Sequence, residues 1–224
     1  MRVLTCDHAA ATVSPGDELT DDDIDALYAA SDPLLRLNFV TTLDGAATGA
    51  DGRSGTINSA ADHRGFTAMR RAADVLLIGA GTARVEGYAP AGTPMVVVSS
   101  RAQLPPTTRG DDVVLATTRS SGAPESETTW LCGQDRVDPA VVVERARRTF
   151  GPHVLCEGGP TLAAELVTAG LVDELGLSWT PNLVGGDRSS HPRLLDGADV
   201  DVDLTCRHLL EEDGSLLGLW RVER

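Results

Sequence analysis

Short runs of consecutive apolar residues recur along the chain and alternate with longer stretches of helical character. The run Val75-Leu76-Leu77-Ile78 contains no polar position, and Val96-Val97-Val98 has the same character. Continuous apolar runs are typical of strands that are buried on both faces of a parallel sheet covered by helices. The pattern predicts strands at 34–40, 74–79, 94–100, 112–118, 128–132, 154–156 and 173–180, and helices at 60–72, 138–150 and 160–169.

The two ends of the chain depart from this alternation in different ways. Residues 205–212 and 216–222 flank Asp213-Gly214, a dipeptide that favours the tight turn of an antiparallel hairpin. Residues 1–33 are polar and acidic, so we expect an N-terminal appendage with one short helix that packs on the domain. The predicted fold class is α/β: a single domain over 34–224, whose mixed, mainly parallel central sheet is flanked by helices and ends in an antiparallel C-terminal hairpin.

Charge and composition narrow the classes of partner. The 224 residues carry a formal net charge of −14, which disfavours nucleic acid and anionic membranes. The cysteines include no C-x-x-C pair and none at zinc-ligand spacing with a histidine, so we expect no metal site. We also expect a reduced, cytoplasmic protein without a signal peptide or membrane span. The four cysteines are Cys6, Cys132, Cys156 and Cys206.

The segment from His153 to Leu162 combines a short apolar strand, an acid, two glycines and a helix that a proline opens. Pro160 suits the first helical position, and Gly158 and Gly159 allow another backbone to approach closely. The free N–H groups of the new helix and its positive dipole suit an anion such as a phosphate. The same two glycines also fit a plain strand-to-helix turn without a ligand.

Two more strand ends carry residues that can bind phosphate. Gly79-Ala80-Gly81-Thr82 follows one apolar strand and opens a helix, and Ser99-Ser100-Arg101 follows the next. Ligands of open α/β sheets bind beyond the carboxyl ends of the strands, so the three ends together predict a dinucleotide crevice. The hydroxyls and guanidinium of 99–101 suit the ribose 2′-phosphate of NADPH, although Arg101 alone also fits a solvated loop. No G-x-G-x-x-G follows the first strand, which disfavours an ordinary Rossmann dehydrogenase.

Further motifs occur in a fixed order from about residue 34 to the C-terminus. They are Asn38-Phe39-Val40-Thr41-Thr42-Leu43-Asp44-Gly45, Met69 to Thr82, Glu157-Gly158-Gly159-Pro160-Thr161-Leu162, Leu171 to Leu175 and Pro181 to Gly186. Together they resemble the reductase domain of riboflavin biosynthesis, which is the C-terminal domain of a bifunctional deaminase/reductase and has a dihydrofolate-reductase-like fold. No H-x-E with P-C-x-x-C is present, so the chain resembles a stand-alone reductase.

The resemblance implies an NADPH-dependent oxidoreductase of riboflavin biosynthesis, acting as a homodimer. Hydride would pass to the ribosylamino carbon of 5-amino-6-(5-phosphoribosylamino)uracil and open the ribose to a ribityl chain. The resemblance places Asp44, Ser54, Arg70 and Glu157 at the substrate, with Asp44 also the candidate catalytic residue. The strand ends and the resemblance together assign to the cofactor Thr41, Thr42, Gly79, Ala80, Gly81, Thr82, Glu86, Ser99, Ser100, Arg101, Gly158, Gly159, Pro160, Thr161 and Leu162.

Residue type alone gives some of these positions a second interpretation. Arg70 would meet a substrate phosphate or form a surface salt bridge, and for the neighbouring Arg71 the salt bridge is favoured. Asp44 would handle a proton or bond its own backbone in a turn. Glu157 would hydrogen-bond a pyrimidine edge or orient the glycine turn.

One stretch departs from the family pattern. The family continues from the Gly-x-Gly-Thr turn to an arginine that helps hold the substrate phosphate, whereas here no arginine follows residues 83–90 until Arg101. Two alternatives therefore stay open: a reductase of another heterocycle such as a dihydropterin, and an NADPH-binding protein without turnover. Tyr88 would stack on a flat substrate in the first case, or simply pack. The apolar hairpin residues 216–220 would supply a dimer interface or the core face of an edge strand.

Overall fold

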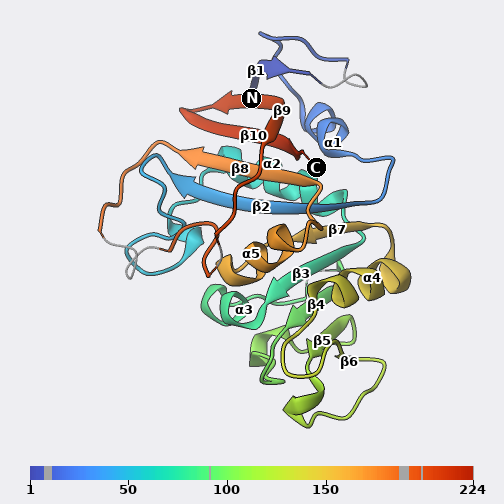
Figure 1. Ribbon diagram of the computed structural model, residues 1–224. Coiled ribbons are helices and arrows are strands. Elements are labelled where there is room, and N and C mark those ends of the chain that lie inside the picture. Colours follow the sequence, from blue (N-terminus) through green and yellow to red (C-terminus); the bar gives the residue numbers. More distant parts are fainter. Residues whose placement is uncertain (8–11, 91, 187–191, 198, 224) are drawn as a thin grey trace.

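The structure, a computed structural model, describes residues 1–7, 12–90, 92–186, 192–197 and 199–223. Within these residues ten strands form one sheet in the order β1-β9-β10-β8-β2-β7-β3-β4-β5-β6 (Figure 1). The strands are β1 (Arg2–Cys6), β2 (Leu34–Thr42), β3 (Val75–Gly79), β4 (Met95–Val98), β5 (Val113–Thr117), β6 (Thr129–Leu131), β7 (His153–Cys156), β8 (Glu174–Thr180), β9 (Leu204–Glu212) and β10 (Ser215–Val222). The helices are α1 (Asp21–Tyr28), α2 (Ala60–Arg71), α3 (Ala80–Glu86), α4 (Pro139–Phe150) and α5 (Pro160–Thr168), with short 3-10 helices η1 (Ser54–Thr56), η2 (Pro106–Thr108) and η3 (Arg119–Ser121).

The sheet has a parallel part and an antiparallel part. All pairings from β8 through β2, β7, β3, β4 and β5 to β6 are parallel. The pairings of β1 with β9, β9 with β10 and β10 with β8 are antiparallel, and β9 turns into β10 at Asp213-Gly214 as predicted. The predicted fold class, a mixed and mainly parallel sheet of dihydrofolate-reductase type with an antiparallel C-terminal hairpin, is confirmed.

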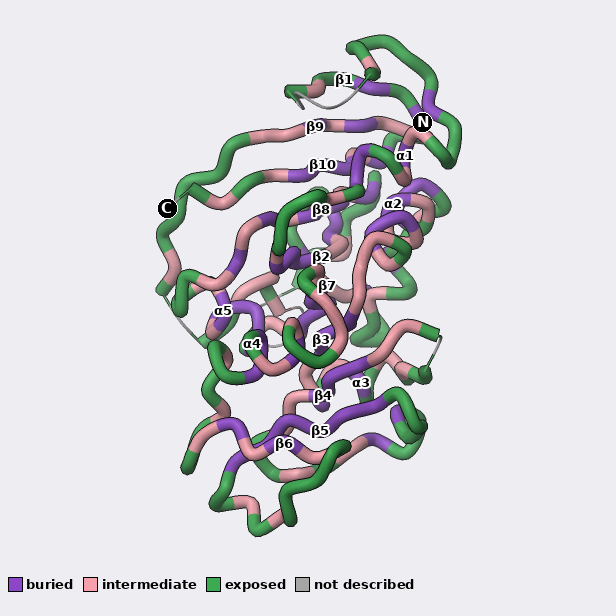
Figure 2. Tube along the Cα trace, turned by 90° about the vertical axis from the view of Figure 1, so that its right-hand side faces the viewer, coloured by how far each residue is buried: buried purple, intermediate pink, exposed green. Residues whose placement is uncertain are grey.

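Helices cover both faces of the parallel part, as Figure 2 shows from the side. Leu76 and Ile78 of β3 belong to the core that includes α1, α2 and α3. Val75 and Leu77 belong to the second core, under α4 and α5. Successive side chains of a strand point to opposite faces, so a strand covered on both must be apolar throughout. This explains the continuous apolar runs of the sequence.

Local signals set the helix ends near the carboxyl edge of the sheet. The Ser59 side chain accepts a hydrogen bond from the Asp62 N–H and starts α2, and Asp138 caps α4 in the same way. Pro160 stands in the first turn of α5, where its missing N–H costs nothing. The N-cap residue of α5 is Gly159, which has no side chain to cap the helix. The first N–H groups of α5 therefore lack a capping side chain.

The first 33 residues contribute a strand that the hydrophobic pattern did not predict. Residues Arg2–Cys6 form β1, which pairs antiparallel with β9 at the edge of the sheet. Within β1 only Val3 is buried, so the strand is too short and too polar to show a clear alternation. The predicted short helix is α1, whose Ile24 and Leu27 are buried in the core beside α2.

A buried ion pair joins two adjacent strands of the parallel part, β2 and β8. Arg36 of β2 and Glu174 of β8 are 3% and 7% exposed. Arg36 donates to Glu174 Oε2 from Nε at 2.9 Å and from Nη2 at 2.6 Å. Arg36 Nη1 also donates to the Tyr28 carbonyl of α1 at 2.9 Å, and Arg207 of β9 lies 3.3 Å from Glu174 Oε1. Buried charges are tolerated when they are paired and hydrogen-bonded in this way.

Replacing Glu174 with Gln is expected to lower the free energy of unfolding by about 3–5 kcal/mol, because Arg36 would stay buried without its anionic partner. Chemical denaturation followed by tryptophan fluorescence measures this change. Glu223→Gln is the control, since this carboxylate pairs with Arg221 at the surface and its loss should leave the midpoint unchanged. A wild-type midpoint for Glu174→Gln would show that the pair does not stabilise the fold.

Candidate functional site

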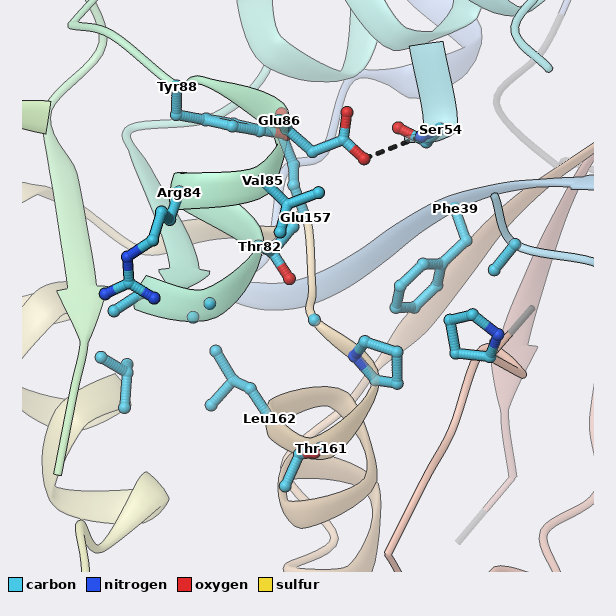
Figure 3. A pocket seen from close by; sticks show the side chains of 18 of the residues that line it. Phe39, Ser54, Thr82, Arg84, Val85, Glu86, Tyr88, Glu157, Thr161 and Leu162 are labelled. Carbon is cyan, nitrogen blue, oxygen red and sulfur yellow. Dashed lines mark hydrogen bonds between the residues drawn. The ribbon is translucent and has the colours of Figure 1, made fainter. Parts of the chain in front are cut away.

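A cleft of about 800 Å³ lies at the carboxyl ends of the parallel strands. It is lined by residues at the ends of β3, β4 and β7 and by the first turns of α3 and α5. Figure 3 shows Thr82 of α3 and Leu162 of α5 on one side, with Phe39 of β2 and Ser54 of η1 on the other. This is the edge at which ligands of open α/β sheets bind.

Glycines bring the ends of β3 and β7 into direct contact. The Gly79 N–H donates to the Gly158 carbonyl oxygen at 2.7 Å. A Cβ at Gly79 would lie 3.3 Å from the Gly159 nitrogen, and a Cβ at Gly159 would run into the Thr82 hydroxyl. Gly158 has a φ of +90°, which L side chains rarely adopt, and its peptide bond to Gly159 is cis. This wall of the cleft is therefore bare backbone that a ligand can approach closely.

The first turn of α5 borders the cleft at the same point. Gly159, Pro160, Thr161 and Leu162 all line it, and Gly159 offers no capping side chain. The first N–H groups of a helix have no partner within the helix, and its dipole is positive at that end. The wall thus combines close backbone approach with free donors, which suits a phosphate.

Hydroxyls and guanidinium groups line the same side of the cleft. The segment Ser99 to Arg101 follows β4, and Arg136 follows β6, in the neighbouring part of the sheet. Arg84 of α3 also lines the cleft, and in Figure 3 its guanidinium points away from Ser54. Among the described residues, Arg84 and Arg101 form no salt bridge, whereas Arg136 has a carboxylate partner. Unpaired guanidinium groups next to serine hydroxyls form a second place suited to a phosphate.

Glu157, the residue after β7, is the centre of a hydrogen-bond network at the cleft. Its buried carboxylate accepts from Arg70 Nε at 2.7 Å and from Arg70 Nη2 at 2.6 Å. The Tyr88 hydroxyl donates to the same carboxylate at 2.6 Å. The Arg70 guanidinium carbon lies 4.3 Å from the centre of the Phe66 ring. These three bonds leave roughly one of the four lone-pair positions of the carboxylate to a ligand.

The surroundings of Arg70 and Tyr88 in this network raise the pKa of both side chains. Burial works against the charge of Arg70, but hydrogen bonds and the negative charge of Glu157 outweigh it and raise the Arg70 pKa. Burial and then Glu157 raise the pKa of Tyr88 well above its ordinary value. Both groups therefore keep their protons at neutral pH and act as donors to Glu157. Arg70, expected to face the substrate, directs its guanidinium to Glu157, while Arg71 forms the predicted surface salt bridge, with Asp25.

Glu86 connects the end of α3 to η1. Its Oε1 accepts a hydrogen bond from the Ser54 N–H at 2.8 Å (Figure 3). The sequence assigned Glu86 to the cofactor and Ser54 to the substrate, and both line the cleft. Their mutual bond ties the η1 loop to the C-terminal end of α3.

Two buried polar side chains, Asp62 and Asn38, line the cleft although neither was predicted as a site residue. Asp62 in the first turn of α2 is 3% exposed, and Asn38 of β2 is 8% exposed. Asp62 Oδ1 and Asn38 Oδ1 have no hydrogen-bond partner. Burial raises the pKa of the Asp62 carboxyl, against a hydrogen bond with Ser178 and the charge of His63, which lower it.

The spacing of residues along the sequence could have indicated that Asp62 belongs to the cleft. Asp62, Phe66 and Arg70 stand at i, i+4 and i+8, and residues at that spacing share one face of a helix. Only Arg70 was identified, through the family motif. Asn38 stands inside a quoted motif, but nothing in the sequence indicates that its side chain is buried beside α2.

Most predicted site residues come together in this one cleft. Gly158 and Arg70 do not line the cleft themselves. Gly158 is buried next to Gly159, which does, and Arg70 hydrogen-bonds Glu157, which also does. The roles of all these residues in cofactor or substrate binding stay predictions. Those that line the cleft are Ser54, Gly79, Ala80, Gly81, Thr82, Glu86, Ser99, Ser100, Arg101, Glu157, Gly159, Pro160, Thr161 and Leu162.

Thr41, Thr42 and Asp44 are not among the residues that line the cleft. Thr41 and Thr42 are buried, and Asp44 is exposed beside a separate hollow. The Asp44 carboxylate accepts from the Thr42 hydroxyl, from the Gly185 N–H at 2.7 Å and from the Val184 N–H at 3.3 Å. The bonds from Thr42 and Gly185 hold the pKa of Asp44 below its ordinary range. Asp44 thus ties the end of β2 to a later loop, and its expected role in proton handling stays a prediction.

Comparison with known proteins identifies the family. A family model described as the RibD C-terminal domain matches residues 33–215. The chain belongs to this family. The membership expected from the sequence motifs is confirmed, and with it the class of oxidoreductases.

Two curated relatives that are similar to this chain come from archaea. The chain is 32% identical over 190 residues to the 2,5-diamino-6-ribosylamino-4(3H)-pyrimidinone 5′-phosphate reductase of Methanothermobacter thermautotrophicus, covering 75% of this chain and 86% of that protein. A protein of the same name from Archaeoglobus fulgidus is 26% identical over 194 residues, covering 74% and 87%.

A solved structure shares the fold. A pyrimidine reductase-like protein from Corynebacterium diphtheriae superposes with a TM-score of 0.73 at 19% identity, over 86% of this chain and 92% of that one. In this RibD C-terminal domain protein, none of the described helices is long and apolar enough to cross a membrane. The described residues also contain no cluster of three or more His, Cys, Asp or Glu side chains that could hold a metal ion.

Replacing Gly159 with Val is expected to abolish NADPH binding, because the new side chain would meet Thr82 and fill the wall that the backbone leaves bare. The measurement is the rise in melting temperature on adding NADPH, since a ligand of the native state stabilises it. Gly55→Val is the matched control, because a Cβ at Gly55 has nothing within 4 Å. If NADPH raised the melting temperature of Gly159→Val as much as that of the wild type, Gly158 and Gly159 would form only a strand-to-helix turn without a role in binding.

Proposed function

We propose that this protein is an NADPH-dependent reductase of a 6-ribosylaminopyrimidine 5′-phosphate in riboflavin biosynthesis. The reaction adds a hydride to the ribosylamino carbon and a proton to the ribose ring oxygen, which leaves that carbon as the ring opens. The observation that carries the proposal is the single cleft in which a bare, donor-rich backbone wall faces the buried carboxylates Glu157 and Asp62. The names of the archaeal relatives support the same reaction class.

The residues present fit NADPH. Gly159 and the uncapped start of α5 suit its pyrophosphate, because they combine exposed backbone with N–H donors that lack a capping side chain, and Gly79 adds no side chain to this wall. Arg84 and Arg101, which have no carboxylate partner among the described residues, suit its 2′-phosphate together with Ser99. When bound, the reduced nicotinamide supplies the hydride.

The opposite side of the cleft suits a flat, donor-rich heterocycle. The Phe66 ring offers an apolar face, and its neighbour Arg70 is held by Glu157. Glu157 is positioned by Arg70 and Tyr88 and keeps acceptor capacity for a ligand N–H. Hydride transfer requires geometry and exclusion of water more than a strong acid. These residues orient the substrate, and no side chain among them is proposed as its proton donor.

The substrate phosphate meets a different arrangement from the one the family motif implies. Arg84, in the altered stretch 83–90, points away from Ser54, so it adds to the cofactor side. We propose that the Ser54 hydroxyl, on the loop that Glu86 holds through the Ser54 N–H, donates to the substrate phosphate.

A second copy of the chain is the proposed protein partner. The face of β8 and β10 opposite α2 carries partly exposed apolar side chains, and no helix of the described chain covers it in Figure 2. Trp179 and Trp220 meet there edge to face, with ring centres 5.2 Å apart. An apolar patch of this kind suits a homodimer interface. The four cysteines are free, which fits the cytoplasmic location expected from the sequence.

The purified protein is expected to oxidise NADPH when it is given a 6-ribosylaminopyrimidine 5′-phosphate, measured as the fall in NADPH absorbance with the ribityl product identified by mass spectrometry. Dihydrofolate is the comparison substrate, and turnover of dihydrofolate alone would assign the protein to a pterin reductase instead. Stabilisation by NADPH without turnover of any substrate would indicate a binding protein.

Arg101→Ala is expected to weaken NADPH binding by roughly tenfold while leaving NADH binding unchanged, because only NADPH carries the 2′-phosphate. Titration calorimetry with both nucleotides measures the two affinities. Arg109→Ala, at an exposed arginine after η2, is the control for loss of general positive charge. An equal loss for NADPH and NADH would remove Arg101 from the 2′-phosphate site.

A further inference from the structure

Two acceptor oxygens without partners belong to β2 and α2, at residues that line the cleft. Asp62 Oδ1 and Asn38 Oδ1 belong to side chains that are more than nine-tenths buried. A buried polar atom without a hydrogen bond is costly, so such an atom at a cleft indicates a place where a ligand can supply the missing donor. The function proposed above names the Asp62 carboxylate but assigns a ligand contact to neither oxygen.

We propose that Asp62 reads position 2 of the substrate ring and selects a 2-amino-4-oxopyrimidine over the corresponding uracil. This inference rests on the proposed function and specifies its substrate. Asp62 becomes a specificity-determining residue that contacts the heterocycle.

The donor and acceptor patterns of the two candidate rings differ at position 2 and at the adjoining N1, which is an acceptor in the pyrimidinone and an N–H donor in the uracil. The 4(3H)-pyrimidinone presents N3–H and the 2-amino group side by side, which are two adjacent donors. The uracil presents N3–H beside a carbonyl oxygen at position 2. An ionised carboxylate only accepts hydrogen bonds, so it pairs with the first edge and opposes the oxygen of the second.

The surroundings of Asp62 act on its charge in both directions. Burial raises the pKa of the carboxyl, whereas a hydrogen bond with Ser178, the charge of His63 and the helix dipole at the first turn of α2 favour the ionised form. Burial removes water from the same group. Two N–H groups of a bound ring would replace that lost hydration.

The position of Asp62 also matches an edge-on contact with a ring packed beside Phe66. Phe66 lies one helical turn after Asp62 and lines the same cleft with the Arg70 guanidinium over its ring, so a substrate ring packed beside Phe66 would direct an edge toward the Asp62 carboxylate. Asn38 Oδ1 offers a further acceptor for the ring's amino groups. Glu157, bound by Arg70 one turn beyond Phe66, remains for the other end of the substrate.

The Asp62→Asn variant tests the assignment directly. An amide replaces one acceptor by a donor, so its edge complements N3–H and the carbonyl of the uracil. Initial rates with NADPH are measured for 2,5-diamino-6-ribosylamino-4(3H)-pyrimidinone 5′-phosphate and for 5-amino-6-(5-phosphoribosylamino)uracil. Wild type should prefer the diamino compound in kcat/KM, and Asp62→Asn should move the ratio toward the uracil on the order of tenfold to a hundredfold, the range of a bidentate edge contact. Asp25→Asn, the same change on α1, should leave the ratio unchanged.

A second measurement needs no variant. 2,5,6-Triaminopyrimidin-4(3H)-one and 5,6-diaminouracil differ in the group at position 2 and in the proton on the adjoining N1, and their inhibition of wild type should differ by at least about tenfold in favour of the triamino compound. Three results would overturn the role of Asp62: equal inhibition by the two compounds, an unchanged kcat/KM ratio in Asp62→Asn, or an equal loss of kcat/KM for both substrates in that variant. In each case turnover by the wild type would still uphold the proposed function. Wild type that reduces neither phosphate overturns both.

Discussion

The bidentate pair between Arg70 and Glu157 holds the cleft together. It joins the end of β7 to α2, and the Tyr88 hydroxyl brings the segment after α3 to the same carboxylate. Glu157 is buried, so its charge is stable only while these donors surround it. The adjoining glycines are fixed in consequence, because Glu157 leads directly into Gly158 and Gly159. The shape of the glycine wall of the cleft therefore depends on an ion pair that lies outside it.

The two sides of the cleft are built from different parts of the chain. The wall formed by Gly79, Gly159 and the start of α5 is mainly backbone, whose hydrogen-bonding groups do not change with side-chain identity. The opposite side consists of side chains, and α2 supplies Asp62, Phe66 and Arg70 from one face. Substitutions on α2 can therefore change which ligand the side-chain side of the cleft accepts without disturbing the backbone wall.

The order of strands and helices could be predicted because each depends on local pattern. Buried strands such as β3 are apolar throughout, and capping residues such as Ser59 mark helix starts. The family motifs led to Glu157 and the glycine turn. The strand β1 was missed because its pairing partner lies at the far end of the sequence. Asp62 was missed because its burial arises only when α2 packs on the sheet. From the sequence alone, an acid in the first turn of a helix is interpreted as a surface residue that interacts with the helix dipole.

The pairing of β1 with β9 has a consequence for biogenesis. Val3 pairs with Leu210, so β1 finds its partner only after all the residues between them have been made. Closing so long a loop is slow compared with forming local contacts. The parallel part, whose elements from β2 to β8 follow one another, can assemble earlier around its own cores. Until the hairpin arrives, the nascent chain carries an open sheet edge at β8, and that interval is when it is most exposed to aggregation and in most need of a chaperone.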